Sequence, residues 1–174
     1  MRSGSPVLGV AGPLMRAEAE KRKINVGLAV PDRDEMVYLE SVRYGRKVAW
    51  RNVVAGQRVP IELTSLGRAW LAIAPEPQRN ALMAQFRSRH SQRGWLKLER
   101  EIENAKLDVG RLGYCWASWQ PEVVALAAPV RVVGHSLPYI LNMSVASAEP
   151  PRVVTDRLAQ PLLNLAARLE GLLA

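Results

Sequence analysis

The single cysteine and the two histidines are the residues that could most readily support covalent or metal chemistry. Cys115 lies in the segment Gly-Tyr-Cys-Trp, His90 lies in an arginine-rich stretch and His135 lies in a predicted turn. A nucleophilic cysteine needs a nearby base and a cationic or helix-terminal environment, which this spacing does not supply. We therefore predict a buried, inert Cys115 and two solvent-exposed histidines. With so few cysteines and histidines, no metal or cofactor is expected.

The carboxylates offer no acid–base pair either. Three glutamates share one predicted helix with three cations, which is the pattern of a solvated helix face of mixed charge. These six residues are Glu99, Glu101, Glu103, Lys97, Arg100 and Lys106. The chain also lacks a phosphate-binding glycine loop, a G-x-S-x-G nucleophile elbow, an H-E-x-x-H motif and an EF-hand loop. The sequence therefore predicts a protein that is not an enzyme.

The groups best suited to binding are backbone amides and short polar side chains. A helix is predicted to begin at Thr64 or Ser65, and the first N–H groups of a helix have no acceptor within it. Asn142 and Ser144 lie two residues apart on a predicted strand, so they share one face. The formal net charge of +8 attracts anions over a distance. Each of these features is suited to a small anion.

The apolar periodicity indicates the elements that must position these groups. We predict helices over residues 12–23, 64–73, 77–86, 95–112 and 154–172, the last one kinked at Pro161. We predict strands over residues 24–30, 36–42, 114–119, 123–133 and 137–145, and a strand, loop and return over 47–59. The order is helix, about three strands, three helices, about three strands and helix. Because the strands come in hairpin-connected groups, the fold class is α+β, with an antiparallel sheet of about six strands flanked by helices.

The composition is that of one globular domain. The chain has 174 residues, of which 48% are hydrophobic and 23% are charged. We assign residues 12–174 to the domain and residues 1–11 to a flexible lead-in or an unrelated remnant. The absence of an apolar run of about 18 residues argues against a membrane partner, and the single cysteine favours a cytoplasmic location. Basic clusters at 21–23, 43–51 and 87–93 indicate a solvated surface, with direct DNA contact as the alternative.

Four motifs in order resemble one family. Residues 56–72 read GQRVPIELTSLGRAWLA, which is similar to a G-x-x-x-P segment, a small-residue helix start and a G-[KR]-A-x-L-A helix. Leu112-Gly113-Tyr114, the run VALAAPV at 124–130 and LNMS at 141–144 match three further motifs. The chain thus resembles the effector-binding domain of IclR-type bacterial transcription regulators from about residue 14 to residue 172.

The resemblance implies a GAF-like fold, which has a curved antiparallel sheet with helices on both sides and a small-molecule pocket. It also implies a homodimer or homotetramer and a role in transcription control. In that family a winged helix-turn-helix precedes the effector domain, and only about a dozen residues precede the first matching helix here. We therefore expect DNA binding only through an N-terminal domain that is absent from this sequence. The alternative is a free-standing small-molecule-binding protein without a DNA partner.

The resemblance also implies site residues. Family members hold an anionic group of the effector at the start of the G-[KR]-A helix, where this chain has Ser65 and Leu66. With the basic charge of the chain, the resemblance predicts a small organic acid as the ligand. The strand positions that face the effector match four residues, namely Val123, Ala125, Asn142 and Ser144. Some members place an acidic residue and a cysteine in the pocket, and here Ala117-Ser118 and Ala125 stand in that neighbourhood. Trp116 and Trp119 could form an apolar wall, which would suit an aromatic acid. The alternative is that the two side chains pack in the core.

Overall fold

The computed structural model describes residues 6–44, 56–134 and 137–174. The helices are α1 (Pro6–Arg22), α2 (Ser65–Ile73), α3 (Glu76–Arg89), α4 (Gln92–Leu112) and α5 (Pro151–Leu173). The strands are β1 (Asn25–Asp32), β2 (Glu35–Val42), β3 (Arg58–Pro60), β4 (Cys115–Ala117), β5 (Val123–Val130) and β6 (Tyr139–Ala146). This order confirms the predicted sequence of elements.

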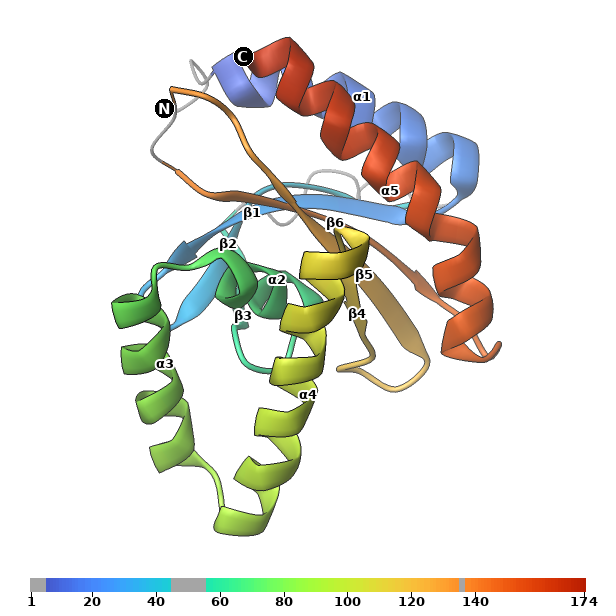
Figure 1. Cartoon of the computed structure of the whole chain (residues 1–174). Coiled ribbons are helices and arrows are strands. Elements are labelled where there is room, and N and C mark those ends of the chain that lie inside the picture. The colour runs from blue at the N-terminus through green and yellow to red at the C-terminus, as the bar shows by residue number, and fades with distance from the viewer. Residues whose placement is uncertain (1–5, 45–55, 135–136) are drawn as a thin grey trace.

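The six strands of the described residues form one antiparallel sheet in the order β3-β2-β1-β6-β5-β4. The N-terminal strands make one half and the C-terminal strands make the other. The two halves join where β1 pairs with β6, for example at Gly27 opposite Asn142. The sheet is strongly curved, and helices cover both faces (Figure 1). The predicted α+β class with a curved antiparallel sheet is thus confirmed.

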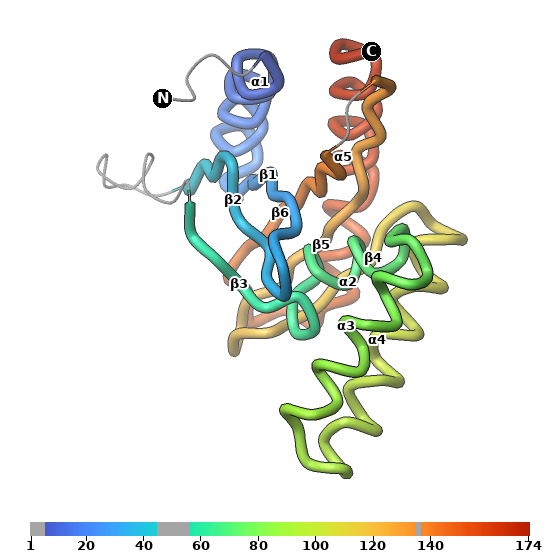
Figure 2. Tube along the Cα trace, turned by 90° about the vertical axis from the view of Figure 1, so that its left-hand side faces the viewer, coloured from blue at the N-terminus to red at the C-terminus, as the bar shows by residue number. Residues whose placement is uncertain are grey.

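Each face of the sheet has its own apolar core. Helices α1 and α5 lie side by side over one face, whereas α2, α3 and α4 lie on the other (Figures 1 and 2). Because side chains alternate along a strand, neighbouring residues serve different cores. On β1, Val26 and Leu28 pack under α1 and α5, while Ala29 packs under α2. On β6, Leu141 joins the first core and Ile140 the second.

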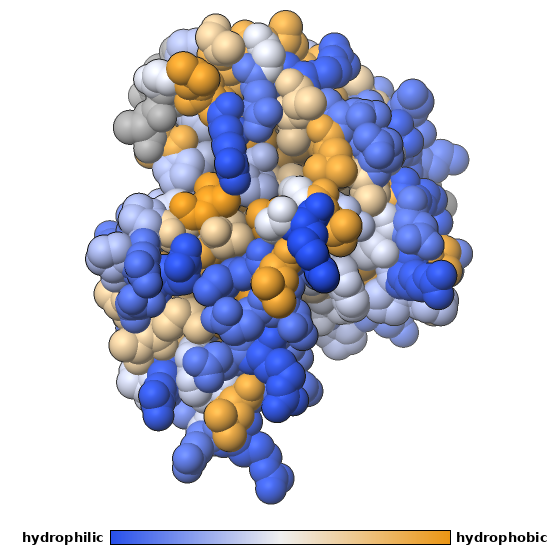
Figure 3. Space-filling model, viewed as in Figure 1, coloured by the Kyte–Doolittle hydropathy of each residue, from blue (hydrophilic) through white to orange (hydrophobic). Residues whose placement is uncertain are grey.

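Local sequence signals fix the ends of the long α4 helix. The Ser91 hydroxyl accepts a hydrogen bond of 3.0 Å from the Gly94 N–H, which caps the N-terminus. Gly113 ends the helix with φ at 88°, a left-handed conformation that favours glycine. The α3–α4 hairpin projects from the body of the molecule, and its surface is mainly hydrophilic (Figures 2 and 3). It carries only scattered exposed apolar side chains, such as Leu96 and Leu107.

Several predicted boundaries differ from the observed ones. Helix α1 begins at Pro6 and not at residue 12, so residues 6–11 form its first turns instead of a lead-in. Buried Val7 and Ala11 explain this extension, because they pack on the core beneath α1. The β1–β2 turn is shorter than predicted, since Pro31 and Asp32 belong to β1.

Strand β4 covers only Cys115–Ala117, and most of the predicted strand pair over 47–59 lies outside the described residues. Strand β5 runs through Pro129, which lies opposite Ile140 of β6. Proline is tolerated there because β4 pairs only as far as Ala127, so the other side of β5 has become a sheet edge.

Among the described helices, none is both long and apolar enough to span a bilayer.

Candidate ligand-binding site

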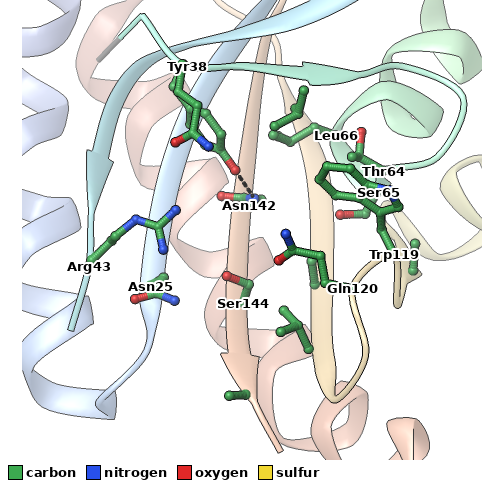
Figure 4. Close-up of a pocket in the computed structure, with 16 residues that line it drawn as sticks. Asn25, Tyr38, Arg43, Thr64, Ser65, Leu66, Trp119, Gln120, Asn142 and Ser144 are labelled. Atoms are coloured by element: carbon green, nitrogen blue, oxygen red, sulfur yellow. Dashed lines mark hydrogen bonds between the residues drawn. The ribbon is translucent and has the colours of Figure 1, made fainter. Parts of the chain in front are cut away.

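A pocket of about 300 Å³ lies on the α2 face of the sheet, beyond the N-terminus of that helix (Figure 4). Its wall combines the first residues of α2 with residues from both halves of the sheet and from the β4–β5 loop. The lining residues are Asn25, Tyr38, Arg43, Gln57, Val59, Thr64, Ser65, Leu66, Ala117, Trp119, Gln120, Val123, Ala125, Asn142, Ser144 and Ala146.

The pocket exists because the side chains on this face of the sheet change along the strands from apolar and packed to small and polar. Beneath α2 the face is apolar and packed, with Ala127 and Ile140 in the core. Two residues further along the same face, the strands carry Ala125 and Asn142, which line the pocket. Small and polar side chains there cannot fill the space that the end of α2 leaves open. The floor of the pocket is therefore neutral, with small apolar and polar side chains.

The N-terminus of α2 faces this pocket. Thr64 caps the helix, since its hydroxyl oxygen accepts from the Gly67 N–H at 3.1 Å and donates to the Pro60 carbonyl at 2.7 Å. The amides of Ser65 and Leu66, the first two helical residues, have no acceptor within the helix. The Ser65 hydroxyl is buried and has no hydrogen-bond partner in the described part of the chain. A buried hydroxyl without a partner costs roughly 1–3 kcal/mol, which a ligand acceptor or donor would recover.

Tyr38 and Asn142 meet across the two halves of the sheet. The Asn142 side-chain N–H donates to the Tyr38 hydroxyl at 3.2 Å (Figure 4). Because this oxygen accepts from Asn142, its own proton is free to point to a ligand. Burial raises the pKa of Tyr38, while the Asn142 hydrogen bond and the charge of Arg43 act in the opposite direction. The phenol therefore stays protonated at neutral pH and remains a donor.

Gly27 has no side chain, and this leaves the space that the Tyr38 and Asn142 side chains occupy. A Cβ at Gly27 would lie 2.4 Å from the Tyr38 ring and 2.6 Å from the Asn142 side-chain oxygen. The two side chains thus lie directly over the glycine backbone.

A β-bulge decides which β2 side chains reach the pocket. The register between β1 and β2 shifts at Leu28/Ala29, so Ala29 pairs with Tyr38 while Leu28 pairs with Glu40. Tyr38 and Arg43 are five residues apart and would point to opposite faces of a regular strand. The shift brings both onto the pocket face, where both line the cavity. Sequence reasoning missed both residues, because no local pattern marks the bulge.

Six of the seven predicted site residues line the pocket together. They are Ser65, Leu66, Val123, Ala125, Asn142 and Ser144. The seventh, Trp116, does not line it, because the neighbouring β4 residue Ala117 takes the pocket side of that strand. Trp116 instead lines a separate surface depression beside α4, together with Arg68 and Asp108. Trp119 lies at the border and lines both hollows.

Cys115 is buried, as predicted, and serves a structural purpose. Its thiol donates to the Ser65 carbonyl at 3.5 Å, which ties β4 to the start of α2. Burial raises its pKa to about 12, so it is a neutral thiol and a poor nucleophile at pH 7.

The prediction of an exposed His90 is wrong. The ring is only 27% exposed, stacks on Trp95 and lies 3.2 Å from the buried Glu62 carboxylate. His135 lies outside the described residues.

The arginine of the G-[KR]-A motif is structural and does not face the pocket. Arg68 is 8% exposed, and its Nε donates to the Glu62 carbonyl at 2.9 Å. It also contacts Glu101 on α4 at 3.2 Å. These bonds hold the turn before α2 against α4 and so fix the position of the helix N-terminus. Among the predicted mixed-charge residues, Lys106 and Glu103 form an exposed ion pair of the expected kind.

The chain matches known proteins over nearly its full length. Residues 3–170 match the family model of the bacterial transcriptional regulator IclR C-terminal domain. Over 147 residues the chain is 27% identical to the HTH-type transcriptional regulator TsaQ1/TsaQ2 of Comamonas testosteroni, covering 82% of this chain and 52% of that protein. The chain thus spans about half the length of this curated relative.

Solved structures agree with this match. An IclR family transcriptional regulator from Brucella abortus superposes with a TM-score of 0.86 at 27% identity, covering 99% of this chain and 65% of that one. The C-terminal domain of the E. coli regulator KdgR has the same fold, with a TM-score of 0.72 at 17% identity and coverage of 95% and 96%. The chain therefore belongs to the IclR family of bacterial transcriptional regulators and corresponds to their C-terminal domain.

Proposed function

We propose that this domain senses a small organic acid, whose carboxylate lies at the N-terminus of α2. The main support is the Ser65 hydroxyl, which is buried and has no hydrogen-bond partner among the described residues. It lies beside the first N–H groups of that helix, which have no acceptor within it. A helix N-terminus favours negative charge through its free N–H groups and its dipole. Nine-residue α2 is held in place by the Thr64 cap and by Arg68, so these donors are preorganised.

The remaining wall is suited to the body of such a ligand. Val123, Ala125 and Leu66 provide apolar contacts, and Trp119 provides an aromatic one. Asn142, Ser144 and the Tyr38 hydroxyl provide neutral polar groups that would fix its orientation. A few polar groups in a mainly small-residue cavity are typical of small-molecule sites, and an aromatic acid would suit the Trp119 wall.

We also propose that the domain acts within a regulator whose DNA-binding part, a winged helix-turn-helix, lies outside these 174 residues. The family membership supports this function over a free-standing binding protein or an enzyme. It also supports a homodimer or homotetramer in the cytoplasm. In two of the basic clusters part of the charge is neutralised, since Arg22 is paired with Glu18 and Arg89 with Asp34. Most of the third cluster, at 43–51, lies outside the described residues.

Calorimetry with carboxylates and their matched amides tests the anion site. We expect acids to bind at least about 10-fold more tightly than the corresponding amides, because a charge-assisted hydrogen bond contributes roughly 1.5–3 kcal/mol. Binding should also quench or shift Trp119 emission, and Trp119→Phe should remove that change while leaving the calorimetric affinity nearly intact. Amides that bind as tightly as the acids would refute the proposed site.

Tyr38→Phe should weaken acid binding by about 3- to 10-fold, because it removes one neutral hydrogen bond worth roughly 0.5–1.5 kcal/mol. The apolar ring remains over Gly27, so the fold should be kept. The matched control is Tyr44→Phe, which changes an exposed phenol that does not line the pocket. Equal affinities of the Tyr38 and Tyr44 variants would show that the Tyr38 hydroxyl does not contact the ligand.

A further inference from the structure

We propose that the effector is a diacid, with a second acidic group bound by Arg43 at the opposite end of the pocket from Ser65. This inference rests on the proposed function, because it extends the same site from one anionic group to two. It assigns to Arg43 the role of a specificity-determining residue, which separates dicarboxylates from monocarboxylates.

The first observation is the charge of the wall. Of the sixteen lining residues, Arg43 is the one with a permanent charge, and the set contains no aspartate or glutamate. Within residues 6–44, 56–134 and 137–174, no carboxylate lies within ion-pair distance of Arg43. Other arginines of the described chain, such as Arg87 and Arg100, also lack an ion pair, but Arg43 is the one that lines this pocket. A guanidinium that faces a cavity without a counter-charge is suited to an anion in that cavity.

The second observation is the placement of the two anion-binding ends. Figure 4 shows Arg43 and Asn25 on one side of the cavity and Thr64, Ser65 and Leu66 on the other. Asn142 and Ser144 lie between these ends. One compact carboxylate at α2 would leave Arg43 without an acceptor. A ligand that carries acidic groups at both ends would satisfy both sites at once.

The third observation is that the residues in the middle of the pocket are uncharged. The cavity is also small. Asn142, Ser144 and Ala125 carry no charge, so they accept a neutral ligand body at little cost. The volume of about 300 Å³ lies at the small end of the range for ligand pockets. A cavity of this size favours a small diacid.

The test compares each diacid with its own monoamide by calorimetry on the full chain. Suitable probes are the linear dicarboxylates from succinate to suberate and the three benzenedicarboxylates. The best diacid should bind roughly 10-fold more tightly than its monoamide, a factor kept modest because Arg43 is partly exposed. Arg43→Met should remove this preference by weakening the diacid alone, and Arg43→Lys should keep part of it.

Arg100→Met is the matched control, because it removes the same charge from the exposed surface of α4, away from the pocket. It should leave the preference for the diacid unchanged. Monoamides that bind as tightly as their diacids, or an Arg43→Met variant that keeps the preference, would overturn the diacid inference alone. Diamides that bind as tightly as the diacids, or a complete lack of binding by every acid, would overturn the proposed organic-acid function as well.

Discussion

Ser65→Pro should abolish binding of the organic acid while leaving a folded domain. Proline removes the N–H of the first helical residue and places its ring carbon where the ligand oxygen would approach. The loss of that charge-assisted hydrogen bond alone costs roughly 1.5–3 kcal/mol, or about 10- to 150-fold in affinity. Proline is tolerated at the first position of a helix, and Thr64 already has the extended backbone that precedes proline, at φ −109° and ψ 154°.

Ser65→Ala is the matched control for this variant. It keeps the backbone N–H and removes only the buried hydroxyl that has no partner among the described residues. We expect it to fold at least as stably as the parent, and to lose about 2- to 10-fold in affinity if the hydroxyl contacts the ligand. Calorimetry gives the affinities, and circular dichroism with a melting curve confirms folding. A folded Ser65→Pro variant with parental affinity would mean that the acid does not lie at the start of α2.

Gly67→Ala should destabilise the domain more than alanine at any other glycine in a described helix. A Cβ at this position would lie 2.0 Å from the Ile61 carbonyl oxygen and 2.2 Å from its Cα. Both atoms are backbone, so no side-chain rotation can relieve the contact. Alanine favours a helix over glycine by about 1 kcal/mol, but the clash should outweigh this gain. We expect a net loss of about 3 kcal/mol or more, which lowers the melting temperature by roughly 6–12 °C.

Gly110→Ala is the matched control, because a Cβ there meets no atom within 4 Å. This exposed α4 position should gain about 0.5–1 kcal/mol from the higher helix propensity of alanine. Urea unfolding followed by circular dichroism gives both free energies of unfolding. If the two alanine variants had similar stability, the contact between α2 and Ile61 would not be the reason for glycine in the G-[KR]-A motif.

The amino-acid sequence by itself determined the order and type of the described elements. Those predictions rest on local physics, namely the periodicity of apolar residues and capping groups such as Ser91 and Gly113. The motifs then located the start of α2 and the β5 and β6 positions that line the pocket. These residues could be found because the resemblance to the IclR family implies them, and strand alternation and the helix terminus agree with it as properties of a few consecutive residues.

Only the tertiary structure decided how the two ends of the pocket come together. Asn142 meets Tyr38 across 104 positions of sequence, through the pairing of β1 with β6. Arg43 joins them because a bulge between β1 and β2 reverses the alternation after Tyr38. On β4, consecutive side chains point to opposite faces of the sheet, so Ala117 lines the pocket and Trp116 points away from it. The register of β1 against β6 is set by the pairing of strands that lie far apart in the sequence, and a shift of one residue exchanges the two faces, so no local pattern can specify it.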